Sequence, residues 1–102
     1  MATAEIFRAL GDPIRLEMVQ RLTKGGRCTI TVLSEGLGVS RQGARKHLQV
    51  LADASLIALR PQGRDVLVSL DPEALLQARR FIAELERRWD ARLEALKRLV
   101  EE

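Results

Sequence analysis

The chain has 102 residues, about the size of one domain, and 46% of them are apolar, which excludes an intrinsically disordered polypeptide. The formal net charge is +3, but it is unevenly distributed. Residues 40–64 hold five basic residues and one acidic residue, so this quarter of the chain has a net charge of +4 and the remainder has a net charge of −1. Such a clustered positive charge is typical of proteins that bind polyanions. The single Cys28 excludes an internal disulfide, and the lack of an apolar signal or membrane-spanning run leads us to expect a cytoplasmic protein.

Two helices are predicted at the start of the chain. The first covers Ala4–Leu10 and ends at Gly11. The second covers Pro13–Thr23, because Asp12 is a favoured N-cap and Pro suits the first helical position. Their apolar residues recur at helical spacing and are expected to face a common core. The predicted core residues are Ile6, Phe7, Leu10, Ile14, Met18, Val19 and Leu22.

The next segment has the spacing of a helix-turn-helix. We predict that Thr31 caps a third helix that runs to Leu37, and that Ser40 caps a fourth helix, Arg41–Ala54. A small residue, a flexible turn residue and an apolar residue stand where two steeply crossing helices require them. These residues are Ser34, Gly38 and Ala44, and the flanking core residues are Leu33, Leu37, Val39, Leu48 and Leu51. Unrelated helical hairpins can imitate this pattern.

A β-hairpin is predicted after the fourth helix. Leu56–Arg60 and Val66–Leu70 are expected to be strands, because apolar residues alternate in the second of them. The turn between them is predicted at Pro61–Arg64, where Gly63 can adopt a positive φ. A helix-turn-helix followed by a hairpin with a charged tip is the order of a winged helix-turn-helix.

The last predicted helix, Pro72–Val100, begins at a second Asp-Pro pair and would be about 43 Å long. Its apolar residues form one stripe at alternating steps of three and four residues. The stripe consists of Leu75, Ala78, Ile82, Leu85, Trp89, Leu93, Leu96 and Val100. Such a helix either lies on its own domain or pairs with a second copy, and its length favours the dimer.

The predicted fold class is therefore mostly α with a small β-hairpin (α+β). We expect a single winged helix-turn-helix domain over residues 1–102. Within it, the helix-turn-helix covers residues 31–54, the wing 56–70 and the dimerisation helix 72–100.

The basic residues of the fourth helix and the hairpin are the candidate contacts with double-stranded DNA. Arg can bind guanine and Gln can bind adenine through two hydrogen bonds each, and a helix N-terminus suits a phosphate. The predicted DNA-binding residues are Ser40, Arg41, Gln42, Arg45, Lys46, His47, Arg60, Gln62 and Arg64. The alternative is a solvated basic face. For His47, the only histidine, a hydrogen bond within the motif is the alternative to a phosphate contact.

Several segments together resemble the ArsR/SmtB-type winged-helix transcriptional repressors. They are Phe7-Arg-Ala-Leu-Gly-Asp-Pro-Ile-Arg-Leu16, Ser40-Arg-Gln-Gly-Ala-Arg-Lys-His-Leu48, Leu51-Ala-Asp-Ala-Ser-Leu-Ile57 and Gly63-Arg-Asp through Leu70-Asp-Pro72. The resemblance implies a homodimer that binds an inverted-repeat operator and represses transcription from it. It also implies that a signal, such as an unidentified small-molecule effector, releases the protein from the operator. Finally, it implies an interface of terminal helices. The expected interface residues are Ile6, Phe7, Leu75, Ile82, Leu85, Trp89, Leu93 and Leu96.

The metal-binding motifs of that family are missing from this sequence. Members commonly carry a Cys-x-Cys pair in the third helix, or His and acidic ligands on the last helix. Here the third helix has no cysteine and the last helix has neither His nor Cys, so no metal and no cofactor are expected. Cys28 is interpreted as a small half-buried residue, with a redox switch as the alternative, and Arg15 as a residue that steadies the junction between helices.

Two other classes of function are the alternatives to a DNA-binding regulator. A winged helix can serve as a protein-interaction module, which would leave the chain without DNA affinity even at low salt. An enzyme is not expected, because no Ser/His/Asp set surrounds the single histidine and no phosphate-binding glycine loop is present.

Overall fold

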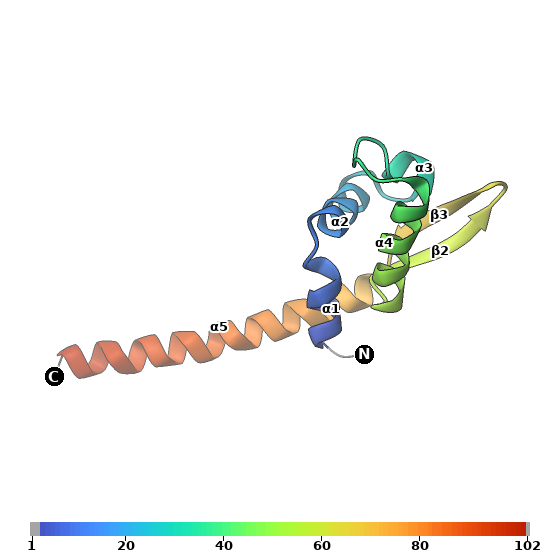
Figure 1. Ribbon diagram of the computed structural model, residues 1–102. Coiled ribbons are helices and arrows are strands. Elements are labelled where there is room, and N and C mark those ends of the chain that lie inside the picture. The colour runs from blue at the N-terminus through green and yellow to red at the C-terminus, as the bar shows by residue number, and fades with distance from the viewer. Residues whose placement is uncertain (1–2, 102) are drawn as a thin grey trace.

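The computed structural model describes residues 3–101, and within them the five predicted helices and the two predicted strands follow one another in the predicted order, with one additional short strand (Figure 1). The elements are α1 (Thr3–Leu10), α2 (Pro13–Gly25), β1 (Cys28–Thr29), α3 (Ile30–Leu33), α4 (Arg41–Asp53), β2 (Ile57–Gln62), β3 (Asp65–Leu70) and α5 (Pro72–Glu101). The three strands form one antiparallel sheet in the order β1-β3-β2. The mostly helical winged helix-turn-helix fold is confirmed.

Local capping fixes where α2 begins. The Asp12 carboxylate accepts hydrogen bonds from the backbone N–H groups of Ile14 (2.8 Å) and Arg15 (3.2 Å). These bonds hold the pKa of Asp12 below its ordinary value, because they favour the charged carboxylate. Asp71 repeats the device at α5, where it accepts a bond of 3.1 Å from the N–H of Glu73. Both predicted helix starts are confirmed.

The third helix differs from its prediction at both ends. Thr29 is the N-cap instead of Thr31, since its hydroxyl accepts a hydrogen bond of 3.3 Å from the N–H of Val32. The helix ends at Leu33 instead of Leu37. The cause of the early start is β1, a strand that the sequence pattern did not predict. Because β1 pairs with the middle of β3, it holds residues 28 and 29 extended, and the helix begins directly after them.

The hairpin is longer and its turn tighter than predicted. Gln62 pairs with Asp65, so the loop consists of Gly63 and Arg64 alone, and Pro61 and Gln62 belong to β2. Gly63 has the predicted positive φ, +60°, as a two-residue hairpin loop requires. Pro61 is tolerated because β2 lies at the edge of the sheet.

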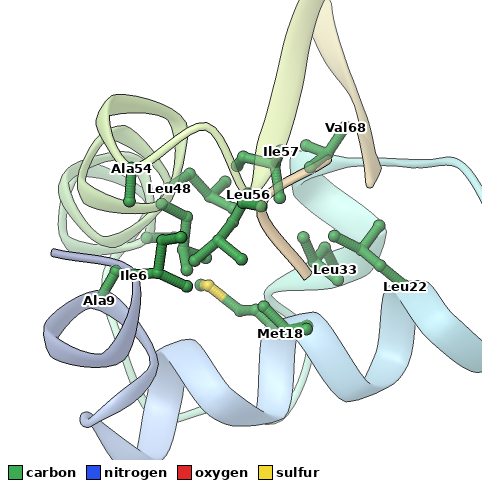
Figure 2. Packing of buried hydrophobic residues seen from close by; sticks show 14 of the residues in the cluster. Ile6, Ala9, Met18, Leu22, Leu33, Leu48, Ala54, Leu56, Ile57 and Val68 are labelled. Carbon is green, nitrogen blue, oxygen red and sulfur yellow. The ribbon is translucent and has the colours of Figure 1, made fainter. Parts of the chain in front are cut away.

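The core lies where α1, α2, α3 and α4 meet the base of the hairpin. Figure 2 shows side chains from these elements converging around Met18. Its largest fully buried members are Ile6, Met18, Leu22, Leu33, Leu48, Leu51, Leu56 and Val68. Predicted core residues at its edge are only half-buried, among them Phe7, Leu10, Ile14, Leu37 and Val39.

Helix α5 leaves the domain after its first turns (Figure 1). Only Ala74 and Ala78 of this helix are buried, and the molecule measures 68 × 25 × 21 Å along its principal axes. The interpretation that α5 lies on its own domain is therefore wrong. From Ile82 onward, its apolar stripe faces solvent. Within residues 3–101, no helix combines the length and the apolar character that crossing a bilayer requires.

Replacing Gly38 with Ala should destabilise the fold by about 1–2 kcal/mol, because Gly38 has a φ of +72° that an L side chain adopts only at a cost. No steric clash contributes, since nothing lies within 4 Å of the added Cβ. Denaturant unfolding of the variant measures the effect. Gly25→Ala is the matched control: the added Cβ is equally free of contacts, but Gly25 is helical and lacks a positive φ, so this variant should be as stable as wild type or up to about 1 kcal/mol more stable. Equal stability of the two variants would contradict this account.

Candidate DNA-binding surface

One face of α4 fixes the helix in the core. Ser40 is the N-cap, as predicted, and its hydroxyl accepts a hydrogen bond of 3.0 Å from the N–H of Gly43. A Cβ on Gly43 would lie 3.2 Å from this hydroxyl oxygen, so a glycine leaves room for the cap. Ala44, Leu48 and Leu51 follow on the buried side. The opposite side of α4 is therefore presented to solvent in a fixed orientation.

The predicted contact residues of α4 lie on that exposed side. Ser40, Arg41, Gln42, Arg45 and Lys46 are all exposed. In the part of the chain that the structure describes, Arg41, Arg45 and Lys46 form no salt bridge. The positive end of the helix dipole lies at the N-terminus of α4, beside Ser40 and Arg41. This cationic row, Ser40–Lys46, has the chemistry that binds phosphates and the major-groove edges of base pairs.

His47 differs from its neighbours because it turns toward the interior of the domain. It is half-buried, and its Nδ1 lies 3.2 Å from Nη1 of Arg15 and 3.9 Å from Oδ1 of Asp12. Since the guanidinium can only donate, Nδ1 accepts this hydrogen bond. Of the two predicted roles, the structure shows the hydrogen bond within the fold.

Arg15 joins three helices, which confirms its predicted role at the junction. Its Nε donates a hydrogen bond of 2.6 Å to the carbonyl of Ala9, and Nη2 lies 3.4 Å from the carbonyl of Arg8. It thus satisfies carbonyls at the end of α1 from its place in α2, while its third contact reaches His47 in α4. The sequence did not reveal that contact, because the two residues are 32 positions apart.

The wing carries the second group of predicted residues. Arg60, Gln62 and Arg64 are exposed near its tip. Asp65, which the sequence analysis did not single out, holds the wing to the helix-turn-helix. Its Oδ2 accepts a hydrogen bond of 2.7 Å from the hydroxyl of Thr31 in α3. The wing is therefore tied to α3, which precedes α4.

The Thr31 hydrogen bond is the main cause that lowers the pKa of Asp65, and a bond from the N–H of Val66 and the positive charge of Arg41 add to it. Arg41 of the cationic row is therefore one of the charges that act on Asp65 in the wing. The sequence could not identify the Thr31–Asp65 hydrogen bond, because a threonine and an aspartate in separate elements are too common a combination.

The hydrogen bonds of Asp65 predict a specific dependence of stability on pH. The folded-state pKa of Asp65 lies below the ordinary value of 3.8, so its stabilising contribution is present above that value and is lost as the pH falls through the folded pKa. Asp65→Asn should therefore be less stable than wild type near neutral pH, and the gap should shrink below about pH 4. Denaturant unfolding across this range measures it. Asp90→Asn removes a carboxylate that has no hydrogen bond within residues 3–101, and a similar gap for this variant would contradict the assignment.

Cys28 lies in β1, half-buried at the edge of the core. Burial raises the pKa of its thiol, while Arg21 acts weakly in the opposite direction. A raised pKa disfavours the reactive thiolate, which supports the packing interpretation over a redox switch. Among residues 3–101, no three His, Cys, Asp or Glu side chains gather where they could hold a metal ion.

The residues predicted for a dimer interface fall into two groups. Ile6 is fully buried in the core of its own protomer, so it has no surface for a partner and its inclusion was wrong; it faces the core because α1 packs on α4 and α2. Phe7 and Leu75 are half-buried. The residues farther along α5 are exposed: Ile82, Leu85, Trp89, Leu93 and Leu96, and with them Phe81 and Leu99, which the predicted stripe omitted.

Comparisons with known proteins agree with this geometry. Residues 4–60 match a family model described as a helix-turn-helix domain. The chain is 34% identical over 95 residues to the HTH-type transcriptional regulator Rv2034 of Mycobacterium tuberculosis, which covers 93% of this chain and 85% of that protein. It is 33% identical over 69 residues to the HTH-type transcriptional repressor SmtB of the same species, 68% of this chain but only 50% of the repressor. Among solved structures, the ArsR-like transcriptional regulator from Rhodococcus sp. RHA1 superposes with a TM-score of 0.78 at 30% identity, over 95% of this chain and 91% of that one.

Proposed function

Because this chain belongs to the ArsR/SmtB family of DNA-binding winged helix-turn-helix transcriptional regulators, we propose that it acts as a homodimeric repressor on an inverted-repeat operator. In this proposal residues 31–54 read the DNA, residues 56–70 form the wing, and residues 72–100 join two copies. The single observation that carries it is the cationic row of α4, which is exposed while the opposite side of the same helix is buried.

The α4 helix of each copy enters one major groove. Arg41, Gln42 and Arg45 lie on its first two turns, where the N-terminal residues of a recognition helix contact base edges. Ser40 and Lys46 bind phosphates beside them, and the positive helix end adds to that attraction. His47 and Arg15 do not contact the DNA in this proposal. Their hydrogen bond holds α4 at its angle to α2 and thereby positions the contact residues.

The wing lies against the DNA backbone next to the same groove. Arg60, Gln62 and Arg64 supply one amide and two guanidinium groups near a tip that no other element covers (Figure 1). The Thr31–Asp65 hydrogen bond keeps the wing at a constant distance from α4. Phosphate contacts of this kind set the orientation of the protein on the duplex and carry little sequence information.

Dimerisation follows from α5. Its exposed apolar side chains, including Trp89 at 61% and Leu96 at 58% exposure, form a continuous stripe that a monomer leaves in water. Burying such a stripe against a second copy is favourable by about 25 cal/mol per Å² of apolar surface removed from water. Two copies also place two recognition helices on one duplex, which matches a palindromic site.

The test is selection of bound duplexes from a random pool by the purified protein. We expect an inverted repeat with half-sites about one helical turn, or roughly 10 base pairs, apart. Equal affinity for all duplex sequences would reduce the chain to a nonspecific DNA binder. The absence of binding even at low salt would instead favour a protein-interaction module.

A further inference from the structure

An apolar pocket lies between α4 and the wing. Figure 1 shows α4 and the hairpin close together at their base and diverging toward the tip of the wing. The pocket between them has a volume of about 260 Å³ and is lined by α3, α4, β2 and β3. Five of its seven lining side chains are apolar: Ile30, Leu48, Leu59, Pro61 and Val66.

The alternation of side chains in the wing explains why the pocket is apolar. Leu59 and Pro61 lie on one face of β2, directly opposite Val68 and Val66 of β3. Nearest the base of the hairpin, Val68 is fully buried in the core. Leu59 and Val66 are half-buried, and Pro61 is exposed. The apolar face of the wing therefore continues toward the tip, beyond the side chains that cover its base.

The two polar lining residues, Arg45 and Gln49, differ in the partners that they already have. Nε2 of Gln49 donates a hydrogen bond of 2.8 Å to Oδ1 of Asp53. Arg45 is exposed, and within residues 3–101 it forms neither a salt bridge nor a hydrogen bond. A neutral apolar ligand would shield this guanidinium from water and give it no partner, which is unfavourable. A ligand with a negative charge would supply the partner.

The lining therefore favours a small molecule with an apolar body and one carboxylate. A carboxylate accepts two parallel hydrogen bonds from a guanidinium, and such bonds are stronger than those between neutral groups. Arg45 is the one charged residue in the lining that the structure describes, so a single negative charge balances it. A cavity of about 150 Å³ with apolar walls holds benzene. The volume of about 260 Å³ thus accommodates one aromatic ring, its carboxylate and a small substituent.

We propose that the pocket between α4 and the wing binds a single-ring aromatic monocarboxylate. The ring lies among Leu48, Leu59 and Val66, and the carboxylate pairs with Arg45. The bound acid competes with DNA for the Arg45 guanidinium and so weakens operator binding. This inference rests on the proposed function, in which Arg45 contacts the DNA, and it adds the chemical class of an effector and the place where it binds.

Binding of two probes in the absence of DNA tests the pocket itself. Para-toluate and para-toluamide have nearly the same shape, but only para-toluate carries a charge. In calorimetric titrations, the wild type should bind para-toluate with a dissociation constant of about 0.1–1 mM. It should bind para-toluamide at least about tenfold more weakly, because the amide forms no charged hydrogen bond with Arg45. Equal affinity of the wild type for the two probes would overturn the proposal.

Two arginine variants identify the group that holds the carboxylate. Arg45→Met removes the charge and keeps an apolar side chain in the lining, so this variant should bind the two probes with affinities within about twofold of each other. Arg60→Met is the matched control. Arg60 is exposed between Leu59 and Pro61 but lies on the opposite face of β2, so its removal should leave the preference for para-toluate unchanged. A preference that survives in Arg45→Met would contradict the proposed contact.

Filling the pocket should abolish binding of the acid without removing a proposed DNA contact. Leu59→Trp places a larger side chain in the lining and should weaken para-toluate binding at least about tenfold. Its operator affinity should stay within about threefold of wild type. Val66→Phe is a smaller filling substitution and provides the same test if Leu59→Trp does not fold. A folded, filled variant that binds para-toluate as the wild type does would show that the acid binds elsewhere and would overturn the site.

Operator titrations with and without saturating para-toluate, at constant ionic strength, test the competition. The acid should weaken operator binding by the wild type about fivefold or more, the expected effect of losing one arginine contact. By linkage, the operator should weaken binding of the acid by the same factor. Para-toluamide at the same concentration should have no effect, and Leu59→Trp should not respond to the acid. An operator affinity that saturating para-toluate leaves unchanged would overturn the competition.

The failure of this inference and the failure of the proposed function have different signatures. A wild-type protein that selects an inverted repeat, but binds para-toluate no better than para-toluamide, overturns the inference alone. A wild-type protein that binds para-toluate through Arg45, but binds all duplex sequences equally, overturns the proposed repressor and leaves the acid-binding pocket in place.

Discussion

Replacing Arg41 and Arg45 together with Ala is expected to weaken operator binding at least about 30-fold. Each arginine that contacts a base or phosphate contributes about 1–3 kcal/mol. Both side chains are exposed on α4 and form no salt bridge within the described chain, so their removal leaves the domain itself intact. The loss should therefore appear in affinity and not in the free energy of unfolding. Titration of the selected operator at several salt concentrations measures it.

The salt dependence separates phosphate contacts from base contacts in the same experiment. For every arginine that neutralises a phosphate, the slope of log affinity against log salt should flatten by about one. Arg80→Ala with Arg98→Ala is the matched control, since it removes the same charge from exposed positions on α5. If that control weakened binding as strongly, net charge would explain the affinity and α4 would lose its assigned role.

Leu48→Ala should destabilise the protein by about 2–5 kcal/mol, the range for deleting a buried leucine side chain and leaving a cavity. Leu48 is 1% exposed and belongs to the core cluster that seats α4 against the rest of the domain. The same change on an exposed leucine, Leu16→Ala at 43% exposure, should cost less than about 1 kcal/mol.

Denaturant unfolding at one fixed protein concentration compares the two leucine variants, because the stability of a dimer depends on concentration. Leu48→Ala should also weaken operator binding when the fold is still populated, since a loosened α4 no longer holds its side chains in a fixed row. A Leu48→Ala protein as stable as Leu16→Ala would contradict the packing of α4 described here.

Local chemistry in the sequence determined where most elements begin and which side of each helix is buried. Asp12, Ser40 and Asp71 are caps because their side chains bond to backbone N–H groups within three residues, and such contacts need no other part of the fold. The three- and four-residue spacing of apolar residues placed the buried side of α4, and with it the exposed cationic row. The fold class and the candidate DNA surface followed from these short-range signals.

Contacts between distant parts of the chain were decided by the tertiary structure alone. Strand β1 forms because it pairs with β3. It has only two residues, Cys28 and Thr29, and a segment this short has no alternation of apolar and polar residues that could predict a strand. The bonds Arg15–His47 and Thr31–Asp65 join residues that only packing brings together. Ile6 and Ile82 were both expected at the interface of terminal helices that the family resemblance implies, yet Ile6 is buried at 0% exposure and Ile82 is 43% exposed. A helical pattern marks an apolar side of a helix but not the surface that covers it.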